Sequence, residues 1–196
     1  MKFMRRKTQQ TLQAQLADGT EVLLRPIGPD DKPLLEAGMT RLSENSRRLR
    51  FMTPIDSLSR SQLSYLTEID HRNHLAWGAL VDGDPVAVAR VVRLTRDPAE
   101  AELAITVVDD YQRRGLGRLL LELMAELCRH IGIQRFVFEA LPENEGIVRL
   151  LKNYGADHDM GTGVITGTLD LAGVPLPSLS TGEALALADS ARRQAV

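Results

Sequence analysis

A run of apolar, charged and glycine residues between positions 101 and 118, AELAITVVDDYQRRGLGR, has the composition of a phosphate-binding turn. Its apolar half ends at Val108, and Gln112 to Gly117 then open a long amphipathic segment. The first N–H groups of a helix have no partner inside it and carry the positive end of the helix dipole, so they bind a phosphate without a dedicated side chain. The pattern indicates an anion site where a strand leads into a helix.

Two glycines and three arginines strengthen this interpretation. Gly115 and Gly117 have no Cβ, so a ligand can approach the main-chain amides closely. Positive charge around the same spot comes from Arg113, Arg114 and Arg118. An ordinary strand-to-helix turn with a charged first helical turn is the alternative that this motif alone leaves open.

Composition limits the class of protein. A chain of 196 residues with 43% hydrophobic content predicts one domain with extensions and a sizeable core. The formal charge of -2 argues against a protein held on nucleic acid by bulk charge. The single cysteine, Cys128, excludes a disulfide framework within the chain. No apolar run reaches membrane-spanning length and no signal peptide is evident, so we expect a cytoplasmic protein that does not use a membrane.

The elements that position the turn can be read from hydrophobic periodicity and turn residues. Strands are expected at residues 20–27, 74–81, 85–95, 101–108, 134–141 and 164–171. Helices are expected at residues 30–42, 58–68, 116–131 and 142–154. The second and third strands form a hairpin, and the fourth continues it. The helix from 116 then crosses over to a parallel strand. This predicts an α/β (α+β) fold: a mixed, mostly antiparallel sheet flanked by helices, with one parallel β-α-β crossover.

The two ends read differently from the middle. Residues 1–19 are basic and then glutamine-rich, which predicts a flexible or weakly helical arm; a solvated terminus is favoured over contact with nucleic acid or an acidic partner. Residues 20–171 form the predicted domain. Residues 172–196 carry prolines and serines and then an alanine-rich stretch, which indicates a tail with helical character.

The QxxGxG spacing after a strand resembles the acetyl-CoA pyrophosphate loop of the GNAT acetyltransferase superfamily, and the order of elements across residues 22–171 matches that architecture. Four segments look like the catalytic domain of Pat-type protein lysine acetyltransferases: LSENSRRLRF, EIDH, AELAITVVDDYQRRGLG and LPENEGIVRLLKNYG. The resemblance implies acetyl transfer from the co-substrate acetyl-CoA to an amine, with a protein lysine as the leading acceptor, by direct attack in a ternary complex. A small amine or amino acid as acceptor, or a non-catalytic acetyl-CoA sensor, are the alternatives.

The resemblance also implies a general base, Glu102, near the start of the central strand. Strand alternation places Glu102, Ala104 and Thr106 on one face, which is mixed in character and suits a cleft. A glutamate at this position can deprotonate an incoming ammonium group. A solvated glutamate at the end of a strand is the alternative.

The same resemblance assigns the coenzyme contacts. The backbone N–H near Val108 is expected to stabilise the oxyanion, and Val107 and Val108 to pair with the pantetheine arm. The diphosphate is assigned to seven consecutive residues: Gln112, Arg113, Arg114, Gly115, Leu116, Gly117 and Arg118. Asn144 matches an asparagine that contacts the coenzyme arm, although the residue also suits a helix N-cap.

One position departs from the family pattern. Many relatives carry a tyrosine that protonates the leaving thiolate, and Leu151 occupies that place here. Tyr154 lies just before Gly155, where core packing is the favoured interpretation. Leaving-group protonation is therefore expected to come from water or to need no dedicated acid. Asp70, His71 and His74 lack further neighbours of their kind, so no metal site is expected.

Overall fold

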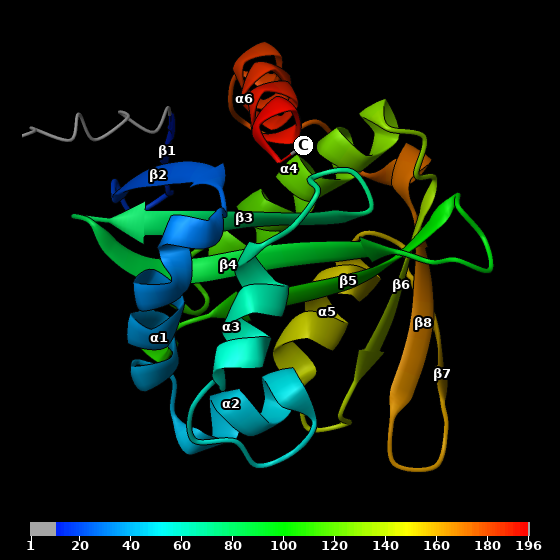
Figure 1. The fold of residues 1–196 in the computed structure, drawn as a ribbon. Helices are drawn as coiled ribbons and strands as arrows, with labels where there is room; N and C mark the ends of the chain where they lie inside the picture. The colour runs from blue at the N-terminus through cyan, green and yellow to red at the C-terminus, as the bar shows by residue number, and fades with distance from the viewer. Residues whose placement is uncertain (1–10, 196) are drawn as a thin grey trace, which may run out of the picture.

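The computed structural model describes residues 11–195, and within them the chain forms one eight-stranded mixed sheet (Figure 1). The strands are β1 (Leu12–Gln15), β2 (Glu21–Pro26), β3 (His74–Val81), β4 (Asp84–Arg93), β5 (Glu100–Val107), β6 (Arg135–Ala140), β7 (Asp157–Met160) and β8 (Ile165–Asp170). Their order across the sheet is β1-β2-β3-β4-β5-β6-β8-β7. Neighbours are antiparallel except for the parallel pair β5 and β6, so the predicted fold class is confirmed.

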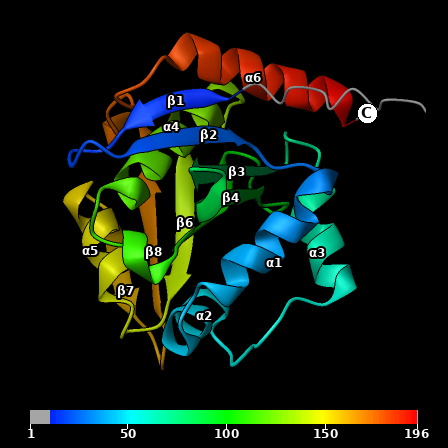
Figure 2. The same ribbon diagram turned by 90° about the vertical axis from the view of Figure 1, so that its left-hand side faces the viewer.

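Helices cover both faces of this sheet. They are α1 (Lys32–Thr40), α2 (Glu44–Phe51), α3 (Arg60–Thr67), α4 (Leu116–His130), α5 (Glu145–Asn153) and α6 (Thr181–Gln194). Viewed along the sheet in Figure 2, α1, α2 and α3 lie on one side, and α4 and α5 lie on the other. The sixth helix packs against α4 and β2. The two faces of the sheet are therefore covered by different helices. The face covered by α1 to α3 is the one that carries Glu102.

Helix α4 provides the largest part of the core. The apolar stripe predicted from helical spacing is buried, with Leu120, Leu123 and Met124 fully removed from solvent. The helix ends before Gly132, which has a positive φ of 82°. Cys128 is fully buried in the same layer, and this burial raises the pKa of its thiol far above the usual range. The thiol acts as a small apolar group.

Three elements were not predicted from the sequence. Residues 12–15, placed in the N-terminal arm, form β1 instead, with Leu12 opposite Leu24 and only 2% exposed. This strand is too short for its alternation to be recognised. The edge strand β7 has four exposed residues, Asp157 to Met160, and thus no apolar pattern. Helix α2 lies in the arginine-rich segment, where Ser43 accepts a hydrogen bond from the Ser46 N–H as its N-cap.

Residues 1–10, which hold the basic part of the predicted arm, lie outside the described residues. The alanine-rich stretch near the C-terminus is helical, as predicted, and forms α6. Its Ala184 is fully buried, so this part of the predicted tail is packed onto the domain.

Candidate active site

The parallel strands β5 and β6 separate shortly after they meet. Their pairing is limited to Glu100 with Arg135, Ala101 with Phe136, and Glu102 with Val137. Beyond this point the strands run apart, which Figure 1 shows clearly. Residues 103–107 of β5 thus have no neighbouring strand on the side of β6, while β4 continues to pair with them on the other side. The sequence could not show this opening, because it depends on the directions of two strands far apart in the chain.

The edge of β5 that faces away from β4 presents unpaired main-chain groups. The pairing of β4 with β5 shows which residues provide them. The Val108 N–H donates to the Val86 carbonyl at 2.9 Å, so it faces β4. Because the direction of main-chain groups alternates along a strand, Ile105 and Val107 direct theirs away from β4. The Val108 N–H itself is thus engaged by β4, and an oxyanion donor near Val108 stays a prediction. The available donors are the N–H groups of Ile105 and Val107.

The Gln112 side chain links residues 112–118, the glycine loop, to the end of β5. Its side-chain amide donates to the Val107 carbonyl at 3.1 Å and to the Ser46 hydroxyl at 3.3 Å. Its own N–H donates to the Asp109 carbonyl at 3.2 Å, so this N–H is not available to a phosphate. Gln112 therefore acts through its side chain, which holds the loop in place.

The N-terminus of α4 is open to an anion. Gly115 is the N-cap with a positive φ of 95°, and it provides no capping side chain. Arg113 also has a left-handed backbone, with φ of 59°. Among residues 11–195, no acceptor is found for the main-chain N–H groups of residues 113–118. Such unpaired donors at the positive end of a 15-residue helix fit the diphosphate of coenzyme A.

Gly117 lies where α4 meets α5. A Cβ built on Gly117 would approach the Leu150 Cδ2 atom to 3.4 Å, so a larger side chain must displace Leu150 or project into the loop. We expect Gly117→Val to weaken acetyl-CoA binding by about tenfold or more, because it moves the donor N–H groups. The measurement is a calorimetric titration with acetyl-CoA.

Gly182 supplies a matched control for this variant. It is the second residue of α6, as Gly117 is of α4, and nothing lies within 4 Å of its added Cβ. Gly182→Val carries the same loss of helix propensity, and acetyl-CoA affinity should be retained. Equal affinity in the two variants would show that the start of α4 does not hold the coenzyme.

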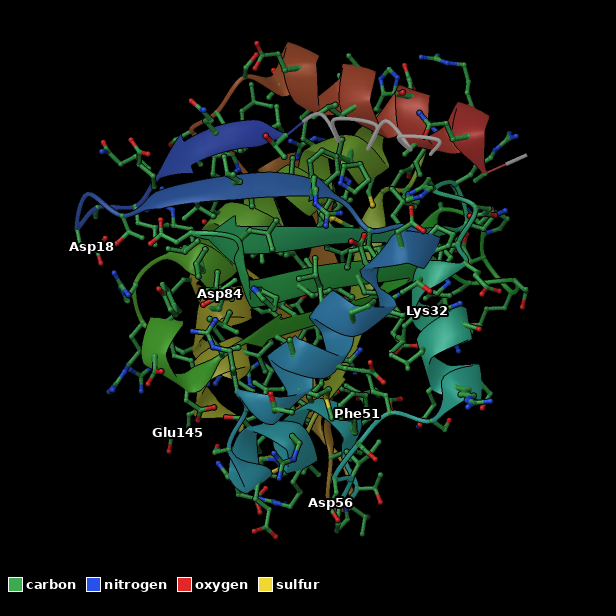
Figure 3. The ribbon with its side chains drawn as sticks, turned by 60° about the vertical axis from the view of Figure 1, so that its left-hand side comes forward. Asp18, Lys32, Phe51, Asp56, Asp84 and Glu145 are labelled. Carbon is green, nitrogen blue, oxygen red and sulfur yellow. The ribbon has the colours of Figure 1, made fainter. Side chains whose placement is uncertain are left out.

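Two arginines of the loop use their side chains within the protein. The Arg114 guanidinium donates to Asp18 at 2.7 Å, contacts Thr20, and lies 4.7 Å from the centre of the Tyr111 ring. Its hydrogen bond holds the pKa of Asp18 down to about 2. Figure 3 shows Asp18 at the tip of the β1–β2 hairpin. The Arg114 side chain thus connects the glycine loop to this hairpin. Because its guanidinium is engaged there, the group of Arg114 that is open to a ligand is its main-chain N–H.

Arg118 is engaged on the other side of the loop. Its guanidinium donates to Glu122 at 2.9 Å, and Glu122 also accepts a hydrogen bond of 2.5 Å from the Tyr154 hydroxyl. Glu122 is only 2% exposed, whereas the Arg118 side chain is 65% exposed. Partial burial, and then the bond to Glu122, raise the pKa of Tyr154 to about 12. Tyr154 is therefore more than a packing residue, and it acts as a donor to Glu122.

Leu151 and Asn144 lie on α5, beside the opened strands. Leu151 is fully buried, so the position of the family's tyrosine belongs to the core in this chain. Asn144 is the N-cap residue of α5, yet its side chain makes no capping hydrogen bond. The capping interpretation of Asn144 is thus not supported. Its assignment to the coenzyme arm stays a prediction.

Glu102 lies on the accessible face of β5. Its neighbours Ala101 and Leu103 are buried on the opposite face, as strand alternation predicted, and Glu102 is exposed. It lines an open depression of about 830 Å³ over β6, β8 and β7. Glu139, Asp157 and Asp159 line the same depression together with one arginine, Arg96, so the carboxylates outnumber the cation. Glu102 therefore stands at one end of an acidic surface, with the opened edge of β5 directly after it.

Asp109 connects the helical layer to the end of β5, a role that the sequence interpretation missed. Its carboxylate accepts hydrogen bonds from the N–H and hydroxyl of Ser43 and from the Ser46 hydroxyl, at 2.8 to 2.9 Å. Partial burial works to raise the pKa of Asp109, and these bonds outweigh it and keep the pKa below its usual range. The serines of the LSENS segment thus fix α2 beside the cleft.

Arg90 and Arg50 were also missed. Arg90 is 5% exposed on β4, inside an otherwise apolar strand, and that interruption was the available signal. Its guanidinium contacts the His74 Nε2 atom and donates to the Leu66 carbonyl at 2.7 Å. Burial, and then Arg90, lower the pKa of His74 to about 4, so this imidazole is neutral at pH 7. It cannot neutralise the charge of Arg90.

Neither a metal cluster nor a membrane-spanning helix is found among the described residues. Across residues 11–195, no three side chains of histidine, cysteine, aspartate or glutamate gather as they would around a metal ion. In the same part of the chain, no helix combines the length and the apolar character that a membrane span requires. Asp70 accepts hydrogen bonds from the N–H groups of Arg72, Asn73 and His74, which gives it a role in the turn before β3.

The opened strand pair and the uncapped helix define an α/β domain built to bind an extended, phosphate-bearing co-substrate. Comparison with known proteins gives the family. Residues 43–156, more than half of the chain, match the acetyltransferase (GNAT) family. The chain belongs to this family of N-acetyltransferases, whose co-substrate is acetyl-CoA.

Three relatives illustrate the similarity. Acetyltransferase Pat of Mycolicibacterium smegmatis is 34% identical over 146 residues, which are 72% of this chain and 43% of that protein. Acetyltransferase PA5475 of Pseudomonas aeruginosa is 32% identical over 124 residues, 61% of this chain and 66% of that protein. The crystal structure of the GNAT domain of S. lividans PAT has a TM-score of 0.77 and 30% identity, and the match covers 82% of this chain and 96% of that one.

The matches cover different shares of the three relatives. The chain spans 43% and 66% of the length of the two curated relatives, so it corresponds to a part of each. It corresponds to nearly the whole of the isolated GNAT domain, at 96%. The similarity to Pat is thus a similarity of the acetyltransferase domain, as the motifs of the sequence predicted.

Proposed function

We propose that this chain acetylates the ε-amine of a protein lysine, in the cytoplasm, by direct attack of the amine on acetyl-CoA in a ternary complex. The observation that carries the proposal is the position of Glu102, exposed at the point where β5 separates from β6. A base at this point stands beside the main-chain donors of Ile105 and Val107. The likeness of four sequence segments to Pat-type enzymes supports lysine as the acceptor.

In the proposed reaction, each residue at the opening of β5 has its own role. Glu102 accepts a proton from the acceptor ammonium group, so that the neutral nitrogen attacks the thioester carbon. Main-chain N–H groups of Ile105 and Val107 donate to the oxyanion that forms. The intermediate then expels the thiolate of coenzyme A and loses a second nitrogen proton to water, which leaves an N-acetyl amide. Since Leu151 is buried and apolar, water supplies the proton that the thiolate takes up.

The acidic surface beside Glu102 supports a cationic acceptor. Direct strand pairing places Glu139 of β6 next to Thr166 of β8, and Thr166 next to Asp159 of β7. Within residues 11–195, Glu139, Asp157 and Asp159 take part in no ion pair. Their combined field attracts an ammonium group toward the cleft and raises its local concentration.

A second candidate is a sensor that binds acetyl-CoA without turnover. It is favoured by one observation: Leu151 occupies the place of the thiolate-protonating tyrosine, and the nearby Tyr154 donates to Glu122. A sensor and an enzyme need the same coenzyme site, so acetyl-CoA affinity alone does not separate them. Turnover does.

The test is a thiol-release assay with acetyl-CoA against lysine-containing proteins and small amines, with mass spectrometry of the products. We expect thiol release to depend on the acceptor, and ε-acetyl-lysine to appear in at least one protein. Turnover only with small amines would show that the acceptor is a small amine and not a protein lysine. Tight acetyl-CoA binding with no turnover would favour the sensor. A failure to bind acetyl-CoA at all would refute both.

A further inference from the structure

We propose that the acceptor carries a carboxylate close to its reactive amine, and that Arg50 and Arg90 bind this carboxylate in a cavity beside Glu102. This inference rests on the proposed acetyl transfer and specifies the acceptor of the same site. It is carried by a small cavity, by two guanidinium groups without a carboxylate partner, and by their position on the face of Glu102.

The cavity lies between the sheet and the layer of α1 to α3. Its volume is about 80 Å³, and most of its lining is apolar, including Met39, Leu58 and Phe51. Figure 3 labels Phe51 at the end of α2. Three lining side chains are polar: Arg50, Arg90 and Thr106. A water molecule occupies about 30 Å³ of liquid, so this space can hold a carboxylate group but no large side chain. Pockets of this kind take their specificity from their few polar groups.

Neither arginine has a carboxylate bonded to it in the part of the chain that is described. Arg50 makes no hydrogen bond or ion pair there; its guanidinium lies 5.0 Å from the centre of the neighbouring Phe51 ring. The partners of Arg90 are the His74 imidazole and the Leu66 carbonyl, which bear no negative charge. Burial, and then the nearby Arg50, lower the pKa of Arg90 to about 10. The two cations thus repel each other in a partly apolar site.

Two uncompensated cations in such a site are costly, and an anion placed between them removes the cost. A carboxylate suits a guanidinium particularly well, because the two planar groups form paired hydrogen bonds. Burial lowers the pKa of Arg50, and Glu102 is the carboxylate whose charge opposes this effect. Arg50 is thus within the electrostatic range of the proposed base without being bonded to it.

The position of the cavity relative to Glu102 sets the kind of acceptor. Arg90 pairs with Ala104 across β4 and β5, and Glu102 and Thr106 lie two residues to either side of Ala104 on the same face. Residues two apart in a strand are separated by about 7 Å. An amine held at Glu102 and a carboxylate held in the cavity are therefore separated by about 7 Å or less, a distance that a lysine side chain or two extended residues can span. The acidic surface on the far side of Glu102 then excludes the reverse orientation.

The same chemistry can come from two sources. One is the α-carboxylate of a free amino acid that is acetylated on its amine. The other is an aspartate or glutamate next to the acetylated lysine of a protein. Both place a carboxylate within one residue of the amine, and they differ in whether a peptide chain continues beyond it.

A binding experiment tests the subsite without turnover. The protein, saturated with free coenzyme A, is titrated by calorimetry with acetylated amino acids and with acetyl-lysine peptides, each in a carboxylate form and in the matching amide form. We expect at least one carboxylate form to bind ten times more tightly than its amide. Arg50→Gln should abolish this preference, and Arg50→Lys should retain part of it, because a point charge replaces the planar group.

Arg60→Gln is the matched control. It removes the same charge from an exposed arginine at the start of α3, outside the cavity, and should leave the carboxylate preference unchanged. A second arm measures kcat/KM for unacetylated acceptors of both forms. Preference among free amino acids identifies the α-carboxylate as the source, and preference only among peptides identifies the neighbouring acidic residue.

The outcomes separate this inference from the proposed function. Equal binding of all carboxylate and amide forms to the wild-type protein would overturn the subsite. An equal loss for both forms in Arg50→Gln would also overturn it, since this is the effect of a structural arginine. A carboxylate preference in binding, together with no turnover of any acceptor, would retain the subsite and refute the proposed acetyl transfer.

Discussion

Replacing Glu102 with glutamine is expected to lower kcat for acetyl transfer by about 10²- to 10⁴-fold, the usual contribution of a positioned general base. The substitution keeps the size of an exposed side chain and removes its capacity to accept the proton of the acceptor ammonium group. The affinity for acetyl-CoA should stay within about twofold of wild type, because the donors of the coenzyme site lie in residues 103–118. Steady-state thiol release gives kcat, and calorimetry gives the affinity.

Glu21→Gln is a suitable control for this variant. Glu21 is an exposed glutamate at the start of β2, and it pairs with Gln15 of β1, far across the sheet from β5. The same loss of charge at this position should leave kcat unchanged. If Glu102→Gln turned over at the wild-type rate, Glu102 would have no part in the chemistry, and a water molecule would have to accept the proton.

Gly167→Ala is expected to lower the free energy of unfolding by about 3 kcal/mol, at the upper end of the usual cost of overpacking. A Cβ on Gly167 would lie 2.4 Å from the Phe138 Cζ atom and 2.5 Å from the Asp157 carbonyl oxygen. The ring can move, but the carbonyl belongs to the backbone of β7 and cannot move without loss of strand pairing. Chemical denaturation followed by circular dichroism measures the change.

The matched control for this prediction is Gly173→Ala. Gly173 is exposed, and an added Cβ meets no atom within 4 Å. Its unfolding free energy should change by less than about 0.5 kcal/mol. A Gly167→Ala protein as stable as Gly173→Ala would mean that β7 is free to move away from β8. The acidic surface would then have no fixed geometry.

Much of this fold follows from local signals in the sequence. The hairpin of β3 and β4 was predicted because a turn of Asp82 to Pro85 separates two apolar runs. Helix α4 was predicted because its apolar residues recur at helical spacing and end before a glycine. The exposure of Glu102 followed from alternation in β5. In each case the signal lies in consecutive residues. It indicates which face of a single helix or strand is buried.

The errors in the prediction come from elements whose stability is supplied by a neighbour. Strand β1 is four residues long and is held by its pairing with β2, so its own sequence carries little information. Strand β7 is polar throughout and is defined by β8. The side chains of Arg114 and Arg118 bond to Asp18 and Glu122, which local sequence could not show, and their contact with the diphosphate stays a prediction.

The sequence by itself determined the family, the order of most elements and the place where the coenzyme diphosphate is expected, because glycines, apolar periodicity and turn residues act locally. Tertiary structure decided which groups meet. Residues distant in the chain create the opening between β5 and β6 and the bond from the Val108 N–H to Val86. They also place Arg50 and Arg90 in the lining of one cavity. Such contacts depend on strand direction and helix packing, which no single stretch of residues specifies.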